Sequence, residues 1–338
     1  MSDEAGFETS KRGGSGVGAG CFWAVVAAFG LFACVGMLGG QGGGPLYTSA
    51  DYGATWRLSS AGNKYWWNIK MSADGSFMIA SYDHAGVPYV SYDFGSTWAA
   101  LAGFTSGQWR DLGVSSDGKV VAVCNNDRNA TNNGARIFIS RSGAVPTDYS
   151  SFTETIDQAS GVICGAMDMA GAGDRLVSSS YSTSKSWIWR FSSGAWSLVT
   201  ELAPPVDWPT APAISADGLK ILVPCYGQEH DYYSTDGGVT FETLTRTDLA
   251  TKVGNASLTP DGSKIFQIAT DKVYSFATGA SASQQQNSNS NVMVQLAPTT
   301  YLNGVIGNKA IVGQGGTVTL LGAGFKSVKL IKVGGESM

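Results

Sequence analysis

Residues 91–98 read SYDFGSTW, and the same spacing of Ser, Asp, Gly, Thr and an aromatic residue returns at residues 49–56 (SADYGATW) and 234–241 (STDGGVTF). An Asp carboxylate at this spacing can accept hydrogen bonds from backbone N–H groups of its own turn, and Gly supplies backbone conformations that a side chain would resist. The final aromatic residue can pack between neighbouring sheets. The three copies therefore predict a tight turn that recurs through a repeated β-structure.

These copies resemble the Asp-box, S-x-D-x-G-x-T-W, of the BNR repeat family, whose members fold as β-propellers. In the families that carry them, the boxes lie on the side of the propeller away from the ligand site. The resemblance therefore implies a structural role, and no catalytic role, for the box residues. These are Asp51, Gly53, Trp56, Asp93, Gly95, Trp98, Asp236, Gly238 and Phe241.

A second repeat, S-x-D-G or T-x-D-G, alternates with the boxes at Asp74, Asp117, Asp217 and Asp261. Each copy is followed by an alternating or apolar run, which predicts a hairpin between two strands. Asp74 and Asp117 are 43 residues apart, and Asp217 and Asp261 are 44 residues apart. A period of about 40–50 residues is typical of four-stranded propeller blades. We therefore predict an all-β fold with a β-propeller over residues 46–338.

The number of blades depends on how the ring closes. Degenerate first hairpins are expected at residues 172–174 and 306–312, and a further strand pair at 317–333. The hairpin at 46–59 has no first half in the repeat pattern. The ring then has six four-stranded blades closed by N- and C-terminal strands, or seven with one incomplete, and six is slightly favoured. Residues 279–292 are polar and of low complexity, which predicts a loop.

Three segments precede the propeller: a polar tail (1–19), an uncharged apolar run (20–39) and a Gly-rich linker (40–45). About 20 apolar residues suffice for a helix to cross a bilayer, so we interpret the run as a helical membrane anchor. Lys11 and Arg12 before it predict a cytoplasmic N-terminus with the propeller on the far side. Two alternatives stay open. One is a secretory or lipoprotein signal around residues 31–34 (LFAC), and the other is a tail buried in an assembly such as a virus particle.

Composition excludes several classes of partner. The formal net charge is −4 and only 14% of residues are charged, so the clustered Lys and Arg that nucleic acid demands are missing. With only two histidines and no CxxC pair, we expect no metal site and no cofactor. Cys124, Cys164 and Cys225 lie in or beside apolar strand-like runs, which favours small buried thiols over a disulfide framework.

A propeller also predicts where a ligand would bind. The loops that join second to third strands, and one blade to the next, share the face opposite the boxes, which we call the loop face. Its candidate binding residues are Trp66, Trp67, Asp83, His84, Trp109, Arg110, Asp207, Trp208, Glu229 and His230. Aromatic platforms with a few polar groups bind sugars or peptides, so the expected partner is a protein or a glycan. The favoured alternative is that the four tryptophans pack between blades, with the polar residues merely solvated.

Sialidases also carry Asp-boxes, and resemblance to them implies an arginine triad, a Tyr nucleophile with a Glu partner and an Arg-Ile-Pro motif. That motif is absent from this sequence. Asp83 and Glu229 are the loop-face carboxylates that could flank a glycosidic bond. We therefore predict no enzymatic activity, with glycoside hydrolysis as the enzymatic alternative.

The sequence as a whole predicts a non-catalytic, membrane-anchored propeller that serves as an interaction or structural module. It would lie outside the cytoplasm or in the particle of a membrane-containing virus, where weakly charged loops suit burial in an assembly. One alternative is a glycan-binding protein or a sialidase-like hydrolase. Another comes from the thylakoid propellers that assist photosystem II assembly. They resemble this chain in length, in Asp-box-like repeats and, in cyanobacteria, in a lipidated N-terminus, but the basic ligand face expected of them is not evident here.

Overall fold

The regular structure in the described part of the chain is almost wholly antiparallel β-strand. The computed structural model describes residues 45–49, 57–126, 135–158, 162–180, 182–203, 208–226, 228, 230–245, 253–269 and 272–277, with further short strands before residue 45 and after residue 292. Within those ranges the one helical element is a single 3-10 turn, η1 (Tyr149–Ser151). The prediction of an all-β chain is confirmed.

Successive strands form units that we call blades and number along the chain. Blade 1 contains β1 (Val25–Ala28), β2 (Leu31–Val35), β3 (Leu46–Ser49) and β4 (Arg57–Leu58). Blade 2 contains β5 (Trp66–Met71), β6 (Met78–Gly86), β7 (Tyr89–Ser91) and β8 (Ala99–Ala100). Blade 3 contains β9 (Gly107–Val114), β10 (Val121–Asn125), β11 (Arg136–Ser140) and β12 (Glu154–Asp157). Because β6 also pairs with β9, blades 2 and 3 are joined in one sheet.

The pattern continues toward the C-terminus. Blade 4 contains β13 (Ala166–Met169), β14 (Arg175–Ser180), β15 (Lys185–Ser192) and β16 (Ala195–Leu202). Blade 5 contains β18 (Ala213–Ile214), β19 (Ile221–Val223), β21 (His230–Ser234) and β22 (Glu242–Thr245), beside a small ladder of β17 (Trp208–Pro209) and β20 (Cys225–Tyr226). Blade 6 has three described strands, β23 (Val253–Leu258), β24 (Lys264–Ala269) and β25 (Lys272–Ala277).

Three short strand pairs follow blade 6. They are β26 (Met293–Leu296) with β29 (Val318–Leu321), β27 (Leu302–Ile306) with β28 (Lys309–Val312), and β30 (Lys332–Val333) with β31 (Glu336–Ser337). The β27–β28 pair is the hairpin expected at residues 306–312, whereas β29 pairs with the earlier β26 instead of a later strand. The low-complexity stretch 279–292 lies outside the described residues.

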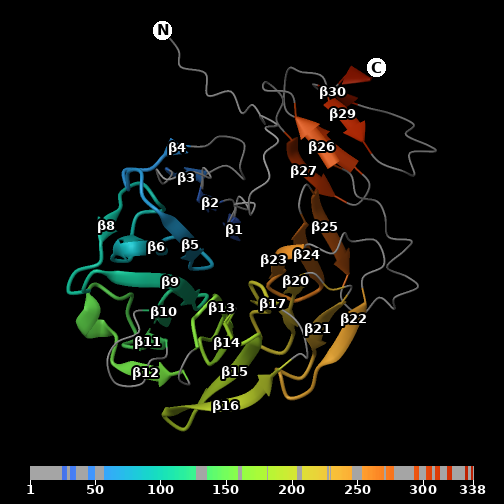
Figure 1. Cartoon of the computed structure of the whole chain (residues 1–338). Coiled ribbons are helices and arrows are strands. Elements are labelled where there is room, and N and C mark those ends of the chain that lie inside the picture. The colour runs from blue at the N-terminus through green and yellow to red at the C-terminus, as the bar shows by residue number, and fades with distance from the viewer. Residues whose placement is uncertain are drawn as a thin grey trace, which may run out of the picture.

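The blades are arranged around a common centre, with β12, β16 and β22 at the rim (Figure 1). The first strands of consecutive blades, β5, β9, β13, β18 and β23, are neighbours around that centre. Apolar side chains pack between one blade and the next: Ile137 of blade 3 shares a buried cluster with Met167 of blade 4, and Val177 of blade 4 shares one with Ile221 of blade 5. A blade on its own would leave both apolar faces in water, so the stack is what buries them.

The structure differs from the expected N-terminal helix. The middle of the apolar run 20–39 contains β1 and β2, which pair with each other and, through β2, with β3. These strands supply the first half that the repeat pattern left missing from the hairpin at 46–59. The helical interpretation is therefore not confirmed. Among the residues that the structure describes, no helix combines the length and apolar character needed to cross a membrane.

A chain of backbone hydrogen bonds joins the first-hairpin turns of blades 2 to 6. Each of these turns opens with a Ser, Thr or Ala residue. The next residue in the sequence donates its N–H to the carbonyl oxygen of the equivalent residue in the following blade. The four bonds are Ala73 to Ser116 (2.7 Å), Ser116 to Gly171 (2.8 Å), Gly171 to Ala216 (2.9 Å) and Ala216 to Pro260 (2.8 Å). We call this series the turn belt, and the side of the propeller that carries it the turn face.

Glycine in these turns meets two demands at once. Gly118 has a φ of +72°, in the left-handed region that other residues enter only at a cost. A Cβ atom built on it would also lie 3.2 Å from the Cβ of Phe77 and 3.3 Å from the Cβ of Ser72, both in the preceding blade. Gly143 has a similar φ of +79°, but a Cβ atom added there would meet no neighbouring segment within 4 Å. The first glycine therefore serves both turn geometry and blade packing, and the second serves geometry alone.

We expect Gly118→Ala to destabilise the protein more than Gly143→Ala. The Gly143 variant should lose about 1 kcal/mol of unfolding free energy from backbone strain. The Gly118 variant should lose roughly a further 1–2 kcal/mol, because blade 2 must shift to admit the methyl group. Chemical denaturation of both variants beside the unchanged protein measures the difference. Equal losses would show that the turn is not packed against the preceding blade.

Candidate functional site

The Asp-boxes at 91–98 and 234–241 are closed hydrogen-bonded turns. The Asp93 carboxylate accepts hydrogen bonds from the Thr97 N–H (2.8 Å), the Thr97 hydroxyl (2.7 Å) and the Ser91 hydroxyl (2.8 Å). The Ser91 hydroxyl in turn accepts the Gly95 N–H at 2.9 Å. The Trp98 indole donates to the Gly95 carbonyl at 3.1 Å and its ring is buried. The Asp93 carboxylate and the Ser91 hydroxyl thus have their partners inside the turn, whereas the Trp98 backbone N–H donates to the Ser60 hydroxyl outside it at 3.1 Å.

The box at 234–241 repeats this geometry. Its Asp236 accepts from the N–H groups of Val239 and Thr240 and from the hydroxyls of Ser234 and Thr240. These bonds, the Thr240 hydroxyl first, lower the pKa of Asp236 to about 2. A carboxylate held in this way is occupied by its own turn. The first box, with Asp51, Gly53 and Trp56, lies outside the described residues.

The tryptophans of the predicted loop face divide into two kinds. Trp66 and Trp109, each 1% exposed, are buried in apolar clusters between blades. Trp67 and Arg110 are half-buried, on neighbouring inner strands, with the guanidinium carbon 4.9 Å from the centre of the indole ring. Both lie near the ends of β5 and β9 that are remote from the turn face. This cation–π pair is the part of the predicted surface that the structure brings together.

The remaining predicted residues are less fully described. His230 begins β21, is half-buried, and its ring meets the Tyr232 ring edge-on at 5.4 Å. Asp207 and Glu229 lie outside the described residues, as do the side chains of Asp83, His84 and Trp208. Within the described part of the chain, no group of three or more His, Cys, Asp or Glu side chains is placed to hold a metal ion.

A polar cluster at the centre of the ring was not foreseen from the sequence. Lys70 of blade 2 reaches across blade 3 and forms a 2.7 Å ion pair with Asp168 of blade 4. The other oxygen of Asp168 accepts the backbone N–H of Ile214 in blade 5 at 3.0 Å. The equivalent position on the intervening strand β9 is Gly113, where an added Cβ would lie 3.0 Å from the Cβ of Met169. The Lys70–Asp168 pair thus links blades 2, 4 and 5, past a position of blade 3 that carries no side chain.

We call Asn68, Lys70, Asp111 and Asp168 the axial cluster. Asp111, on β9, is its buried carboxyl group. It is 1% exposed, and its Oδ1 accepts hydrogen bonds from Asn68 Nδ2 (2.7 Å) and the Leu112 N–H (3.1 Å). Its Oδ2 is buried without a hydrogen-bond partner. Burial raises the pKa of Asp111 to about 7, against the opposing effects of the Asn68 hydrogen bond and the Lys70 charge. At neutral pH this carboxyl group is therefore close to its midpoint of ionisation.

Two carboxyl groups in contrasting environments are a pattern seen in acid–base catalysis. Burial raises the pKa of Asp111, and Asp168 forms an ion pair with Lys70. Asp111 is, however, sealed from solvent, so a substrate could reach its free oxygen only if the blades moved apart. The cluster is suited to coupling blades 2, 3, 4 and 5. The sequence signal that could have found it is the occurrence of Lys70, Asp111 and Asp168 within otherwise apolar first strands.

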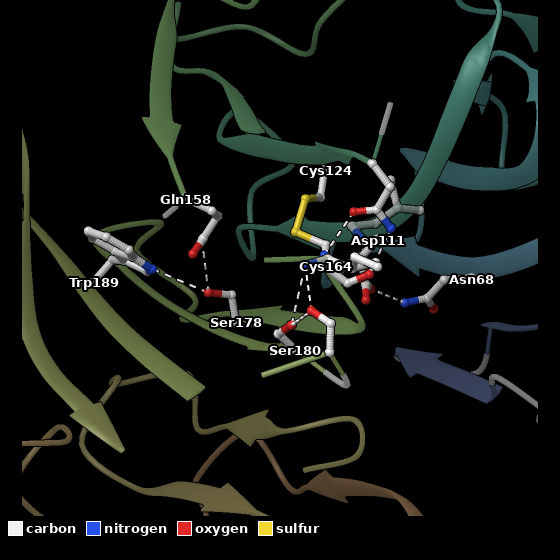
Figure 2. The surroundings of a disulfide bond; sticks show 12 residues. Asn68, Asp111, Cys124, Gln158, Cys164, Ser178, Ser180 and Trp189 are labelled. Carbon is white, nitrogen blue, oxygen red and sulfur yellow. Dashed lines mark hydrogen bonds between the residues drawn. A yellow bond between two sulfur atoms is a disulfide. The ribbon is translucent and has the colours of Figure 1, made fainter. Parts of the chain in front are cut away.

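A disulfide also couples two blades. Cys124 in β10 and Cys164, just before β13, are bonded across the boundary of blades 3 and 4, with Cα atoms 6.4 Å apart (Figure 2). The expectation of reduced thiols was wrong for this pair, because the two strands are neighbours only through blade stacking. Cys225 is a buried thiol outside the disulfide, as expected.

Polar groups surround this disulfide. The Asn126 side chain donates to the Cys164 carbonyl (2.9 Å) and accepts the Cys164 N–H (2.8 Å). Farther along the same boundary, the Ser178 hydroxyl accepts hydrogen bonds from Trp189 Nε1 (3.2 Å) and Gln158 Nε2 (3.4 Å), as Figure 2 shows. The boundary is thus tied by covalent and polar links where serines replace apolar side chains.

Comparison with known proteins agrees with the fold. The family model of the BNR/Asp-box repeat matches residues 232–243, which overlap the third box. No curated protein matches the sequence. Among solved structures, the one titled "YCF48 bound to D1 peptide" is similar with a TM-score of 0.52 and 14% identity, over 75% of this chain and 76% of that chain. At this identity the likeness concerns the fold. The predicted Asp-box β-propeller is confirmed.

The pKa of Asp111 predicts a specific dependence of stability on pH. Because the folded-state pKa is raised above the unfolded value, the unfolding free energy should fall as pH rises from about 4 to about 7, by roughly 4 kcal/mol at most, and then level off. Asp111→Asn should remove this decline. Urea denaturation across that pH range measures it.

Asp236→Asn is the matched control, since the pKa of Asp236 is lowered and its stabilisation is lost only as pH falls below about 4. An unchanged pH profile in Asp111→Asn would contradict the assignment.

Proposed function

We propose that this Asp-box β-propeller is a non-catalytic interaction module that binds an extended peptide segment of a partner protein on its loop face. The observation that carries the proposal is the pairing of Trp67 with Arg110. An indole and a guanidinium present flat, partly exposed surfaces, which suit the planar peptide groups and carboxylates of an extended chain. The pair comes from two adjacent inner strands, so its geometry is set by the rigid part of the ring.

The axial cluster supports a binding role over a catalytic one. Trp67 and Arg110 directly precede Asn68 and Asp111 on the same strands. The carboxyl groups beneath the pair are engaged by Asn68, Lys70 and the backbone, and Asp111 is closed to solvent. The described carboxylates of the Asp-boxes are likewise held by their own turns. Trp67 and Arg110, which are partly exposed on the loop face, therefore suit recognition of a partner.

A structural neighbour supports a peptide as the ligand class. The solved structure of YCF48 contains a bound D1 peptide, so a propeller of similar fold can present a peptide-binding surface. We transfer only the ligand class to this chain, because 14% identity carries the fold and no residue correspondence.

The disulfide supports placement of the propeller in an oxidising compartment, outside the cytoplasm. Disulfides form and persist in extracytoplasmic spaces and are rare where thiols are kept reduced. Cys124 and Cys164 are buried, so their bond would be made during folding and then protected. The proposal needs no membrane anchor, because β1 and β2 occupy the middle of the apolar run.

Peptide selection tests the binding proposal. Short random peptides displayed on phage should yield binders of the full chain, and their affinity should fall about tenfold or more in Arg110→Ala and in Trp67→Ala. Fluorescence anisotropy of the selected peptides measures the loss. Lys119→Ala, on the exposed turn face, is the matched control and should leave affinity unchanged.

Two results would refute this proposal. One is that none of the selected peptides loses affinity for the Arg110 and Trp67 variants relative to the unchanged chain. The other is selective binding of a glycan that the two variants lose, which would replace the peptide by a sugar at the same surface.

Mass spectrometry of alkylated protein tests the compartment. In protein isolated from its native source without reductant, Cys124 and Cys164 should resist alkylation as one linked pair, while Cys225 reacts once the chain is unfolded. With the two cysteines 40 positions apart in the sequence, reduction should lower the unfolding free energy by about 4 kcal/mol. Alkylation of both Cys124 and Cys164 in the unreduced protein would contradict an oxidising location.

A further inference from the structure

The outer strand of blade 4 is unusually long. β16 contains 8 residues, whereas the outer strands β4 and β8 contain 2 each and β12 and β22 contain 4 each. It is the last strand in its sheet, paired on one side with β15 and at the rim of the ring in Figure 1. Its other edge therefore presents the N–H and C=O groups that an added strand would use.

The free edge of β16 carries little of the protection that edge strands commonly have. It contains no Lys, Arg or Pro, and its only ionisable residue, Glu201, is paired with Lys185 and accepts a hydrogen bond from Trp187 Nε1 at 3.0 Å. Leu198 is 47% exposed. One irregularity is present, a register shift opposite Ile188 and Trp189, which bends the strand but leaves pairable backbone on both sides of it. With Glu201 paired to Lys185, the edge carries no unpaired charge, and it includes an exposed leucine.

The hairpin that bears this edge is held rigidly. The guanidinium of Arg141, from blade 3, lies 3.8 Å from the Phe191 ring centre and 5.4 Å from that of Trp196. Glu154 pairs with Arg141 and accepts the Trp196 indole N–H at 2.7 Å. At the tip, Ser193 and Gly194 both have positive φ values, +52° and +83°, which is the conformation of a tight two-residue hairpin turn. A strand fixed in this way loses little entropy when a second strand pairs with it.

We propose that the outer edge of β16 is a docking site for an extended, uncharged β-strand segment of a partner protein, separate from the loop face. Backbone hydrogen bonds would supply the affinity, and an apolar side chain beside Leu198 the specificity. The neutral edge disfavours a strongly charged strand. A second copy of this chain is disfavoured by area, since one strand of this length covers much less than the roughly 1,200 Å² that stable pairs of folded domains bury.

The test uses peptides selected from a library of short random sequences by the full-length Arg110→Ala variant, in which the loop face is impaired. Bound peptide should slow hydrogen exchange of β16 amides. Leu198→Lys should weaken binding about tenfold, because a lysine is placed on the edge. Thr243→Lys, at an exposed position of the outer strand β22, is the matched control and should have no effect.

Backbone pairing gives a sharper signature than affinity. N-methylation of alternate peptide residues should abolish binding in one register and be tolerated in the other, since only every second N–H faces β16. Binding that ignores both Leu198→Lys and N-methylation would overturn the proposal. So would sedimentation of the free protein as a dimer that Leu198→Lys dissociates. Neither result bears on the loop face, which is judged by the Arg110 and Trp67 variants.

Discussion

The hydrogen bond between the first-hairpin turns of successive blades is the constraint on which the rest of this structure depends. Each blade has two apolar faces and buries them only against its neighbours. The turn belt fixes how each blade meets the next, because the same backbone position donates in one blade and accepts in another. Glycines such as Gly118 then let the turn approach the preceding blade closely. The repeat period of the sequence is the number of residues from one turn-belt position to the equivalent position in the next blade.

The belt has a direction and an end. Pro260 accepts the hydrogen bond from Ala216, but proline has no N–H and cannot pass the series on. Side chains follow the same direction: Arg175 donates to the Gly218 carbonyl of the next blade, and Lys220 to that of Gly262. Blades 4 to 6 are therefore tied by backbone and side-chain hydrogen bonds that run in the same direction.

The sequence predicted what is local and missed what depends on the closed ring. Each Asp-box is complete within eight residues, so the roles of Asp93 and Asp236 could be worked out from spacing alone. The strands β1 and β2 carry no turn motif, and an apolar run has the same composition in a sheet as in a bilayer. The Cys124–Cys164 bond and the contact of Lys70 with Asp168 join residues of different blades. Their partners cannot be identified before the stacking is known.

The axial cluster engages polar side chains of the inner strands in contacts between blades. Inner strands converge at the centre, and here Lys70 and Asp168 bridge that centre while Asn68 and Asp111 are tied between blades 2 and 3. Asp111 is buried, whereas Lys70 and Asp168 are partly exposed, and the contacts of these groups hold the blades in one register. A partner can approach Trp67 and Arg110 on the loop face. It can also approach the free edge of β16 at the rim, where Arg141 and Glu154 hold the hairpin of blade 4 in place.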